Sequence, residues 1–273
     1  MTEIYGFDAY SPREIAQRVE TVGVAKARLP LLQLALLGLL AGAFIGLGAL
    51  GFVVVKSDNT LGYAAGQWLG GLVFSLGLLL VVVAGAELFT GNNLLAMAWA
   101  GGLISSRELL RNWLVVCLAN LAGAAGLALL VHLSGHAQLN GGAIGQTVLR
   151  IALAKQALPW QEALMRGVLC NLLVCMAVWM AMAGRSVVDK AVAIVFPISA
   201  FVAAGFEHSI ANMYLMPLAW LLQQSAMAAD QPAVTWAGML GNWLPVIAGN
   251  LLGGSVLVAM VYHLIYRRGQ QPD

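Results

Sequence analysis

Two glutamates and one histidine lie inside long apolar stretches of this sequence, where their side chains could do chemistry. Glu87 and Glu207 each stand five positions before an asparagine, Asn92 or Asn212, and His208 directly follows the second glutamate. An ionisable group in a membrane span is costly unless it is paired or faces water. Each glutamate could carry protons or, as we favour, accept the free backbone N–H groups of a helix start and asparagine side-chain donors. For His208 we favour a ligand path over a purely structural ring.

The composition indicates a membrane protein. Hydrophobic residues make up 60% of the chain, charged residues 10%, and the mean hydropathy is +0.83, which excludes an ordinary soluble domain. Six apolar segments reach the roughly 20 residues with which a helix spans a bilayer. They lie near residues 31–55, 68–104, 112–134, 162–183, 191–222 and 243–266. As continuous helices the second and fifth would be about 55 Å and about 48 Å long, against a hydrocarbon core of about 30 Å. These two must tilt steeply or break.

The pattern Gly-x-Glu-x4-Asn lies near the centre of both overlong segments. Its glycine is a place where a chain can leave helical geometry, so we predict broken helices there. Such breaks occur at membrane depth only where protein covers them or where they line a cavity. The duplication extends to Asn120-Leu-Ala-Gly123 and Asn250-Leu-Leu-Gly253. The predicted fold is an all-α membrane protein with six transmembrane helices in two inverted three-helix repeats, whose second and fifth helices are broken.

Basic residues near the predicted helix ends indicate the orientation. One side carries ten of them: Arg13, Arg18, Lys26, Arg28, Arg107, Arg111, Arg185, Lys190, Arg267 and Arg268. The other side carries at most four: Lys56, Arg150, Lys155 and Arg166. We therefore expect both termini in the cytoplasm, with an amphipathic helix in 1–30, a six-helix transmembrane domain at 31–268 and a short tail at 269–273. Ser11-Pro12-Arg13-Glu14 predicts the start of the first helix, lying on the membrane surface or packed on a neighbouring subunit.

Several function classes find little support in the sequence. It shows no metal-ligand cluster, no nucleotide-binding loop and no sizeable soluble domain, so we expect no enzyme, metal or cofactor. A membrane enzyme using Glu207 and His208 as acid and base is a remote alternative. A water or glycerol conduit is another, but both breaks carry Glu-x4-Asn in place of Asn-Pro-Ala. The net charge of +2 is spread in small groups that topology explains, so nucleic-acid binding is not expected.

The segment Gly205-Phe-Glu-His-Ser-Ile-Ala-Asn-Met213 resembles the hallmark segment of the formate/nitrite transporter family, and Gly85-Ala-Glu-Leu-Phe-Thr90 resembles its second-helix loop. The resemblance covers nearly the whole chain. It implies an aquaporin-like fold, a homopentamer with one pore per protomer, and a multi-pass position among the lipids of the bacterial cytoplasmic membrane. It also implies transport of small monovalent anions such as formate, nitrite or hydrosulfide.

Carried over by position, the resemblance assigns roles to single residues. His208 would be the central pore histidine, Thr90 its partner on the first broken helix, and Asn171 the third member of this polar patch. Lys155 resembles the basic residue of the outer vestibule. Two apolar collars would enclose the patch, formed by Leu78 and Leu88 on the inner side and by Phe74, Val174 and Phe201 on the outer side. From the sequence alone, without the resemblance, we would prefer ordinary helix packing as the explanation of the collar residues.

These parts predict transport assisted by protonation. The positive ends of the half-helices and Lys155 would draw an anion in, but a bare anion should stall at the apolar collars. In water, a proton moves from imidazolium to a carboxylate at a cost of about 3.4 kcal/mol. Removing both groups from water favours the neutral pair, so a proton could pass from His208, or from water that it orders, to the substrate. Formate is the favoured substrate because Phe206 and the two collar phenylalanines resemble the formate branch; nitrite and hydrosulfide are the alternatives.

Overall fold

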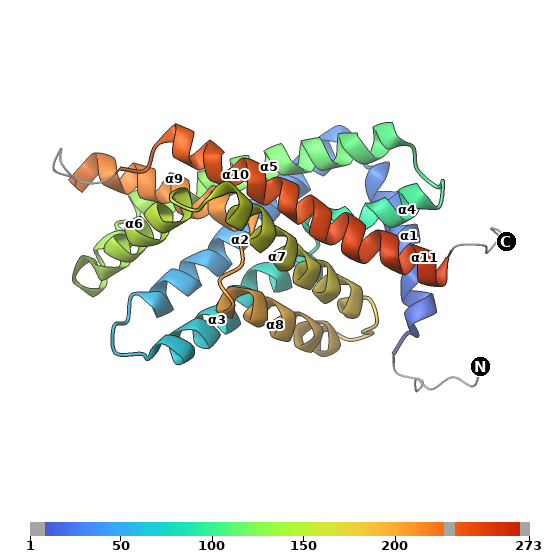
Figure 1. The fold of residues 1–273 in the computed structure, drawn as a ribbon, viewed down its shortest axis with the longest axis horizontal. Coiled ribbons are helices and arrows are strands. Elements are labelled where there is room, and N and C mark those ends of the chain that lie inside the picture. The colour runs from blue at the N-terminus through green and yellow to red at the C-terminus, as the bar shows by residue number, and fades with distance from the viewer. Residues whose placement is uncertain (1–8, 227–232, 268–273) are drawn as a thin grey trace.

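The computed structural model describes residues 9–226 and 233–267, and within these ranges every regular element is a helix (Figure 1). The elements are α1 (Pro12–Ala27), α2 (Leu31–Lys56), α3 (Tyr63–Ala84), η1 (Gly91–Leu94), α4 (Leu95–Ala100), α5 (Ser106–Leu133), η2 (His136–Gln138), η3 (Asn140–Gly142), α6 (Ala143–Gln156), α7 (Trp160–Ala181), α8 (Val187–Ala203), α9 (Ser209–Ala226), α10 (Trp236–Leu251), η4 (Leu252–Met260) and α11 (Val261–Tyr266). Residues 1–8 of the predicted N-terminal region and the whole predicted tail at 269–273 lie outside the described residues.

Most of the predicted apolar segments form helices of the length and composition of membrane spans. In the described ranges, five helical stretches are long and apolar enough to cross a membrane: Leu31–Lys56, Tyr63–Ala84, Ser106–Leu133, Trp160–Ala181 and Trp236–Tyr266. The predicted segment at 191–222 is instead divided between α8 and α9, which have 17 and 18 residues. The chain is therefore a multi-pass membrane protein, while the count of six spans stays a prediction.

Both predicted helix breaks occur at the predicted glycines. Helix α3 ends at Ala84, and Gly85 adopts a φ of +81°. Helix α8 ends at Ala203, and Gly205 adopts a φ of +72°. These angles lie in the left-handed region that only glycine adopts at little cost. The chain then runs without regular structure until the short helices η1 and α4 begin after the first break and α9 begins after the second.

Close helix packing positions the breaks. Helix α2 packs along α3 and α5, and α7 packs along α10 and α8. Glycines lie where two of these pairs touch: a Cβ atom at Gly123 would clash with the carbonyl oxygen of Leu39, and one at Gly249 would clash with the carbonyl oxygen of Leu164. Small residues allow such close backbone contact, and the resulting van der Waals packing is one of the forces that associate helices within a membrane.

Helix α1 begins as predicted and packs inside the protomer. Ser11 and Glu14 form a complete capping box, and the hydrogen bonds from Ser11 hold the pKa of Glu14 below its usual value. Ile15 and Val19 are buried in one apolar cluster with side chains of α4 and α7, including Met97. The apolar face is therefore covered by its own chain, while the position of this helix on the membrane surface or on a neighbouring subunit stays a prediction. Helices α1 and α11 lie side by side at the right of Figure 1.

Candidate functional site

A ring of four polar side chains surrounds the first helix break. Lys26 Nζ lies 2.9 Å from Glu87 Oε1, and Nδ2 of Asn92 donates to Glu87 Oε2 at 2.7 Å. The same Nδ2 donates to Oδ1 of Asn112 at 3.0 Å, and Nδ2 of Asn112 donates to the carbonyl oxygen of Lys26 at 3.1 Å. Glu87 is buried, so the ring supplies the cation and hydrogen bonds that a buried carboxylate needs.

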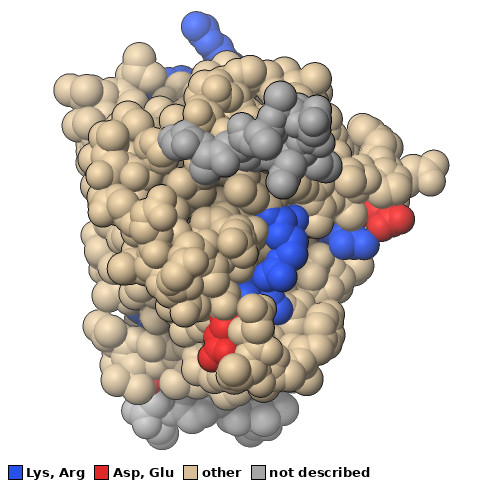
Figure 2. Space-filling view, turned by 90° about the vertical axis from the view of Figure 1, so that its left-hand side faces the viewer, with Lys and Arg blue, Asp and Glu red and all other residues tan. Residues whose placement is uncertain are grey.

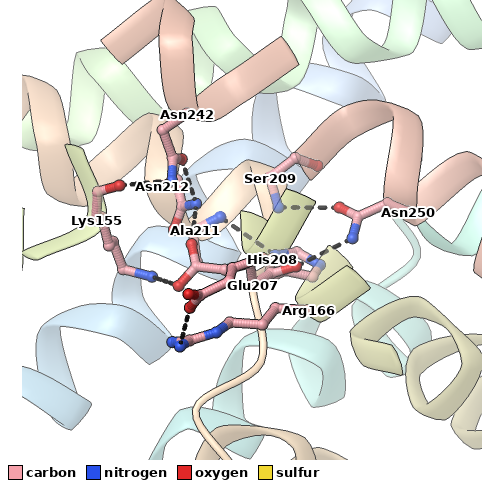
Figure 3. A network of polar contacts seen from close by, with 10 residues as sticks. Lys155, Arg166, Glu207, His208, Ser209, Ala211, Asn212, Asn242 and Asn250 are labelled. Atoms are coloured by element: carbon pink, nitrogen blue, oxygen red, sulfur yellow. Dashed lines mark hydrogen bonds and ion pairs between the residues drawn. The ribbon is translucent and has the colours of Figure 1, made fainter. Parts of the chain in front are cut away.

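The second break carries the same ring of residue types (Figure 3). Lys155 Nζ lies 2.8 Å from Glu207 Oε1. Nδ2 of Asn212 donates to Glu207 Oε2 at 2.7 Å and to Oδ1 of Asn242 at 2.8 Å, and Nδ2 of Asn242 donates to the carbonyl oxygen of Lys155 at 3.0 Å. In both rings the carboxylate binds a lysine and an asparagine side chain, and the supporting role that we favour for the two glutamates stays a prediction.

An asparagine from the third long helix of each half ties down the unwound backbone. Nδ2 of Asn120 donates to the carbonyl oxygens of Gly38, at 2.7 Å, and Glu87, at 2.9 Å, while its Oδ1 accepts from the N–H of Phe89 at 2.9 Å. One side chain thus satisfies three backbone groups that the break leaves without helical partners.

Asn250 makes the matching contacts at the second break. Its Nδ2 donates to the carbonyl oxygens of Gly167, at 2.8 Å, and Glu207, at 3.0 Å, and its Oδ1 accepts from the N–H of Ser209 at 3.0 Å. The repeated Asn-Leu-x-Gly motif therefore marks the residue that fixes each break.

Sequence reasoning missed three members of the two rings. Lys26 was counted only as a charge that indicates topology, and Asn112 and Asn242 were not singled out. A signal was present, because Lys26 and Lys155 are 129 positions apart and Asn112 and Asn242 are 130 apart, close to the spacing of Asn120 and Asn250. A search for residues repeated at this offset would have found them.

His208 and Thr90 face each other across the two breaks. Thr90 Oγ1 lies 3.0 Å from Nε2 of His208, and both residues are buried. Nδ1 of His208 accepts from the backbone N–H of Ala211 at 3.2 Å, so in the neutral ring the proton is on Nε2 and donates to Thr90. The structure thus brings together the histidine and the threonine that the resemblance paired.

Two cavities approach this pair from opposite ends. A cavity of about 520 Å³ is lined by α1 and by Leu78 and Leu88; we call it the α1-side cavity. A cavity of about 330 Å³ is lined by Phe74, Phe201 and His208; we call it the α6-side cavity. Among the described residues the two cavities share no lining residue. The predicted collar residues Leu78 and Leu88 therefore lie on one side, and the two phenylalanines on the other.

Aromatic rings enclose His208 at the α6-side cavity. The ring of Phe201 is stacked on the imidazole with centroids 5.9 Å apart, and Phe74 lies edge-on to Phe201 at 5.7 Å. Three cations, Lys56, Lys155 and Arg166, also line this cavity. Figure 2 shows this end of the molecule, where Lys and Arg side chains gather in the hollow. The arrangement can attract an anion and then present it with an apolar passage beside an imidazole.

Asn171 and Val174 do not line either cavity among the described residues. Asn171 is fully buried, and its Nδ2 donates to the carbonyl oxygens of Thr90, at 3.2 Å, and Asn250, at 2.7 Å. It therefore links the two breaks through the backbone. Val174 is buried in the main apolar cluster, so its place in a collar stays a prediction. In the described ranges no three His, Cys, Asp or Glu side chains gather as a metal site would require.

Comparisons with known proteins agree with this geometry. The family model described as formate/nitrite transporter matches residues 13–264. The chain is 39% identical to the formate channel FocA of Escherichia coli (strain K12), with 96% of each chain covered. It is 35% identical to the formate channel BtFdhC of Bacillus thuringiensis, with 95% of this chain and 96% of the relative covered.

Two solved structures are similar over most of the chain. One is described as a pentameric formate channel with formate bound; it has a TM-score of 0.80 and 37% identity and covers 86% of this chain and 97% of its own. The other is described as an FNT family ion channel; it has a TM-score of 0.83 and 32% identity and covers 92% of this chain and 98% of its own.

Proposed function

This chain belongs to the formate/nitrite transporter family, and we propose that it carries formate across the bacterial cytoplasmic membrane with a proton supplied at His208. The relatives are named channels and transporters, and the chain is a transport protein rather than an enzyme. The observation that carries the proposal is the contact of 3.0 Å between Thr90 Oγ1 and His208 Nε2, which joins the two helix breaks beside a cation-lined cavity.

The first step is attraction of the anion. Lys56, Lys155 and Arg166 line the α6-side cavity together with one acidic residue, Glu207, so the cavity has an excess of positive charge that raises the local concentration of a small anion. Lys155 is already paired with Glu207 and Arg166 with Glu162, which leaves most of the attraction to Lys56.

The second step is neutralisation. An unpaired anion pays a large desolvation cost when it enters the space between Phe74 and Phe201. When His208 carries a second proton, both ring nitrogens become donors, so the Ala211 N–H loses its acceptor. That charged ring, enclosed by apolar side chains, is poised to give its proton to a carboxylate that reaches it. The neutral acid then passes Leu78 and Leu88, and the imidazole returns to its neutral form.

We propose the finer architecture as well. The matching rings at the two breaks support two inverted repeats of three spans each, which places both termini on one side; the basic residues near the helix ends favour the cytoplasmic side. The similar solved channel described as pentameric supports a homopentamer for this chain. Exposed apolar side chains on the spanning helices, among them Leu36, Leu72 and Leu118, suit contact with lipid or with neighbouring protomers.

Formate is the substrate that the relatives' names favour. Nitrite and hydrosulfide remain the alternatives, because each is a small monovalent anion of a weak acid and fits the same two steps. A strong-acid anion such as chloride cannot be neutralised by imidazolium, so it separates protonation-assisted transport from simple anion conduction.

Solid-supported-membrane electrophysiology on the purified protein in liposomes tests the proposal. Concentration jumps of formate, nitrite, hydrosulfide and chloride are compared at several pH values. We expect currents for the weak-acid anions, largest for formate, and none for chloride. His208→Asn should abolish the pH-dependent current, whereas the matched control His136→Asn, outside both cavities as far as the described residues show, should leave it unchanged. A His208→Asn protein that assembles normally and keeps its pH dependence would contradict the proposal.

A further inference from the structure

Two side chains of α7 converge on the backbone of Thr90. Asn171 Nδ2 donates to its carbonyl oxygen at 3.2 Å, and Cys175 Sγ donates to the same oxygen at 3.3 Å. The two donors are four positions apart, so they share one face of the helix. Both are completely buried. This carbonyl is therefore held on the α7 side, while the hydroxyl of the same residue meets His208.

These donors are not part of the duplicated frame. At the offset of 129 positions that relates Lys26 to Lys155, Asn171 corresponds to Gly42 and Cys175 corresponds to Gly46. Glycine has no side chain to donate. The two halves thus support their breaks alike. They differ at Thr90, the residue that contacts His208, because among the described residues only there do side chains of α7 donate to the backbone of the break.

The last span is shaped to fit Cys175. Gly254 lies in η4, a π-helical segment, and π-helical turns often occur at functional sites. A Cβ atom at Gly254 would lie 2.7 Å from Cys175 Sγ and 2.8 Å from Cβ of Asn93, and it would clash with Asn171. Asn93 in turn accepts from Nδ2 of Asn171 at 2.7 Å. Any side chain at position 254 would therefore crowd the Asn171 amide and the Cys175 thiol together.

We propose that Cys175 is a positioning residue whose thiol, together with Asn171, fixes the Thr90 carbonyl and so directs the Thr90 hydroxyl at Nε2 of His208. The inference rests on the proposed proton route through His208. Thr90 belongs to the irregular turn that precedes η1, where the backbone lacks the support of a full helix. Without the thiol the Thr90 carbonyl keeps only Asn171 as its side-chain donor, so the peptide is held less firmly and the distance from the hydroxyl to the imidazole varies more.

The first test compares Cys175→Ala with Cys175→Ser in the full-length protein in liposomes. Loss of one hydrogen bond should lower the formate current by about fivefold to tenfold and shift the midpoint of its pH profile. A serine hydroxyl donates to the same carbonyl, so Cys175→Ser should restore both. Equal losses in the two variants, or a wild-type pH profile in Cys175→Ala, would overturn the proposal.

A second variant crowds both donors to the Thr90 carbonyl, Asn171 and Cys175, without removing either side chain. Gly254→Ala should shift the pH profile in the same direction as Cys175→Ala. Gly241→Ala is the matched control in the same span, because a Cβ atom there meets nothing within 4 Å. If Cys175→Ala does not assemble as a channel, Gly254→Ala decides: a wild-type profile there counts against the proposal.

A spectroscopic measurement separates positioning from transport. In protein labelled with ¹⁵N-histidine, the Nε2 signal of His208 is assigned by its loss in His208→Asn. Cys175→Ala should move this signal and Cys175→Ser should not. If the signal moves as expected but formate currents do not depend on His208, the positioning role stands and the proposed proton route fails. An unmoved signal in Cys175→Ala overturns the positioning role itself.

Discussion

Thr90 Oγ1 and His208 Nε2 lie 3.0 Å apart although 118 positions separate the two residues in the chain. The contact exists because each residue follows a glycine with positive φ, and because matching rings of polar side chains hold the two breaks. It places an alcohol and an imidazole, the two groups suited to handle a proton, between two cavities.

The hydroxyl of Thr90 accepts the buried Nε2–H of His208. In Thr90→Val this N–H loses its acceptor, at a cost of about 1–3 kcal/mol, and we expect a formate current reduced about tenfold or more together with lower thermal stability. Thr90→Ser keeps the acceptor and should stay within about twofold of wild type. Electrophysiology and thermal unfolding of the same preparations check this. Equal currents in the valine and serine variants would show that the hydroxyl plays no part.

Lys155 and Glu207 should stabilise the second break only when both charges are present. Breaking a buried pair by removing one partner costs about 3–5 kcal/mol, because the other charge is left uncompensated. We expect Lys155→Met to lower the free energy of unfolding by about 3 kcal/mol, and Lys155→Met/Glu207→Gln to recover most of the loss.

The control for this cycle is the pair of Arg166 and Glu162. Their side chains are 41% and 53% exposed, so Glu162→Gln should cost less than about 1 kcal/mol. The free energy of unfolding is measured for all of the variants in detergent. A double variant that loses as much as the sum of its single changes would rule out coupling between Lys155 and Glu207.

Asn120 satisfies three backbone groups at the first break. Asn120→Ala leaves these buried groups without partners, so we expect the free energy of unfolding to fall by about 3 kcal/mol or more. Hydrogen exchange should show that the N–H of Phe89, which Oδ1 of Asn120 accepts, loses protection. Gln161→Ala, at an exposed position near the start of α7, is the control. Unchanged protection of the Phe89 N–H would refute the assignment of Asn120 as the residue that fixes the break.

Close contact between α2 and α5 should make Gly123 intolerant of any side chain. A Cβ atom there clashes with the carbonyl oxygen of Leu39, whereas one at Gly126, three residues later on the same helix, meets nothing within 4 Å. Gly123→Ala should therefore reduce the yield of assembled protein severalfold, and Gly126→Ala should leave it unchanged or improve it, since alanine favours the helix by about 1 kcal/mol. Size-exclusion profiles of the two purified variants give the comparison.

The sequence alone determined the features that depend on local composition. Apolar length predicted the spans. The excess length of two segments, with a glycine near the centre of each, predicted the breaks, because the cost of burying polar groups in a bilayer leaves few alternatives. The spacing of repeated motifs indicated the duplication. The residues that carry the family resemblance also included His208 and Thr90, which the structure places in contact.

Only the tertiary structure decided which side chains meet. Lys26 pairs with Glu87 across 61 positions, and α1 is buried on its own chain, since both depend on the path of the backbone rather than on any local pattern. The π-helical geometry of Leu252–Met260 and the hydrogen bond from the Cys175 thiol to the Thr90 carbonyl also depend on the tertiary structure. Periodicity determines which residues share a helix face. Contacts of about 3 Å between side-chain atoms of different helices follow from packing, which one sequence does not reveal.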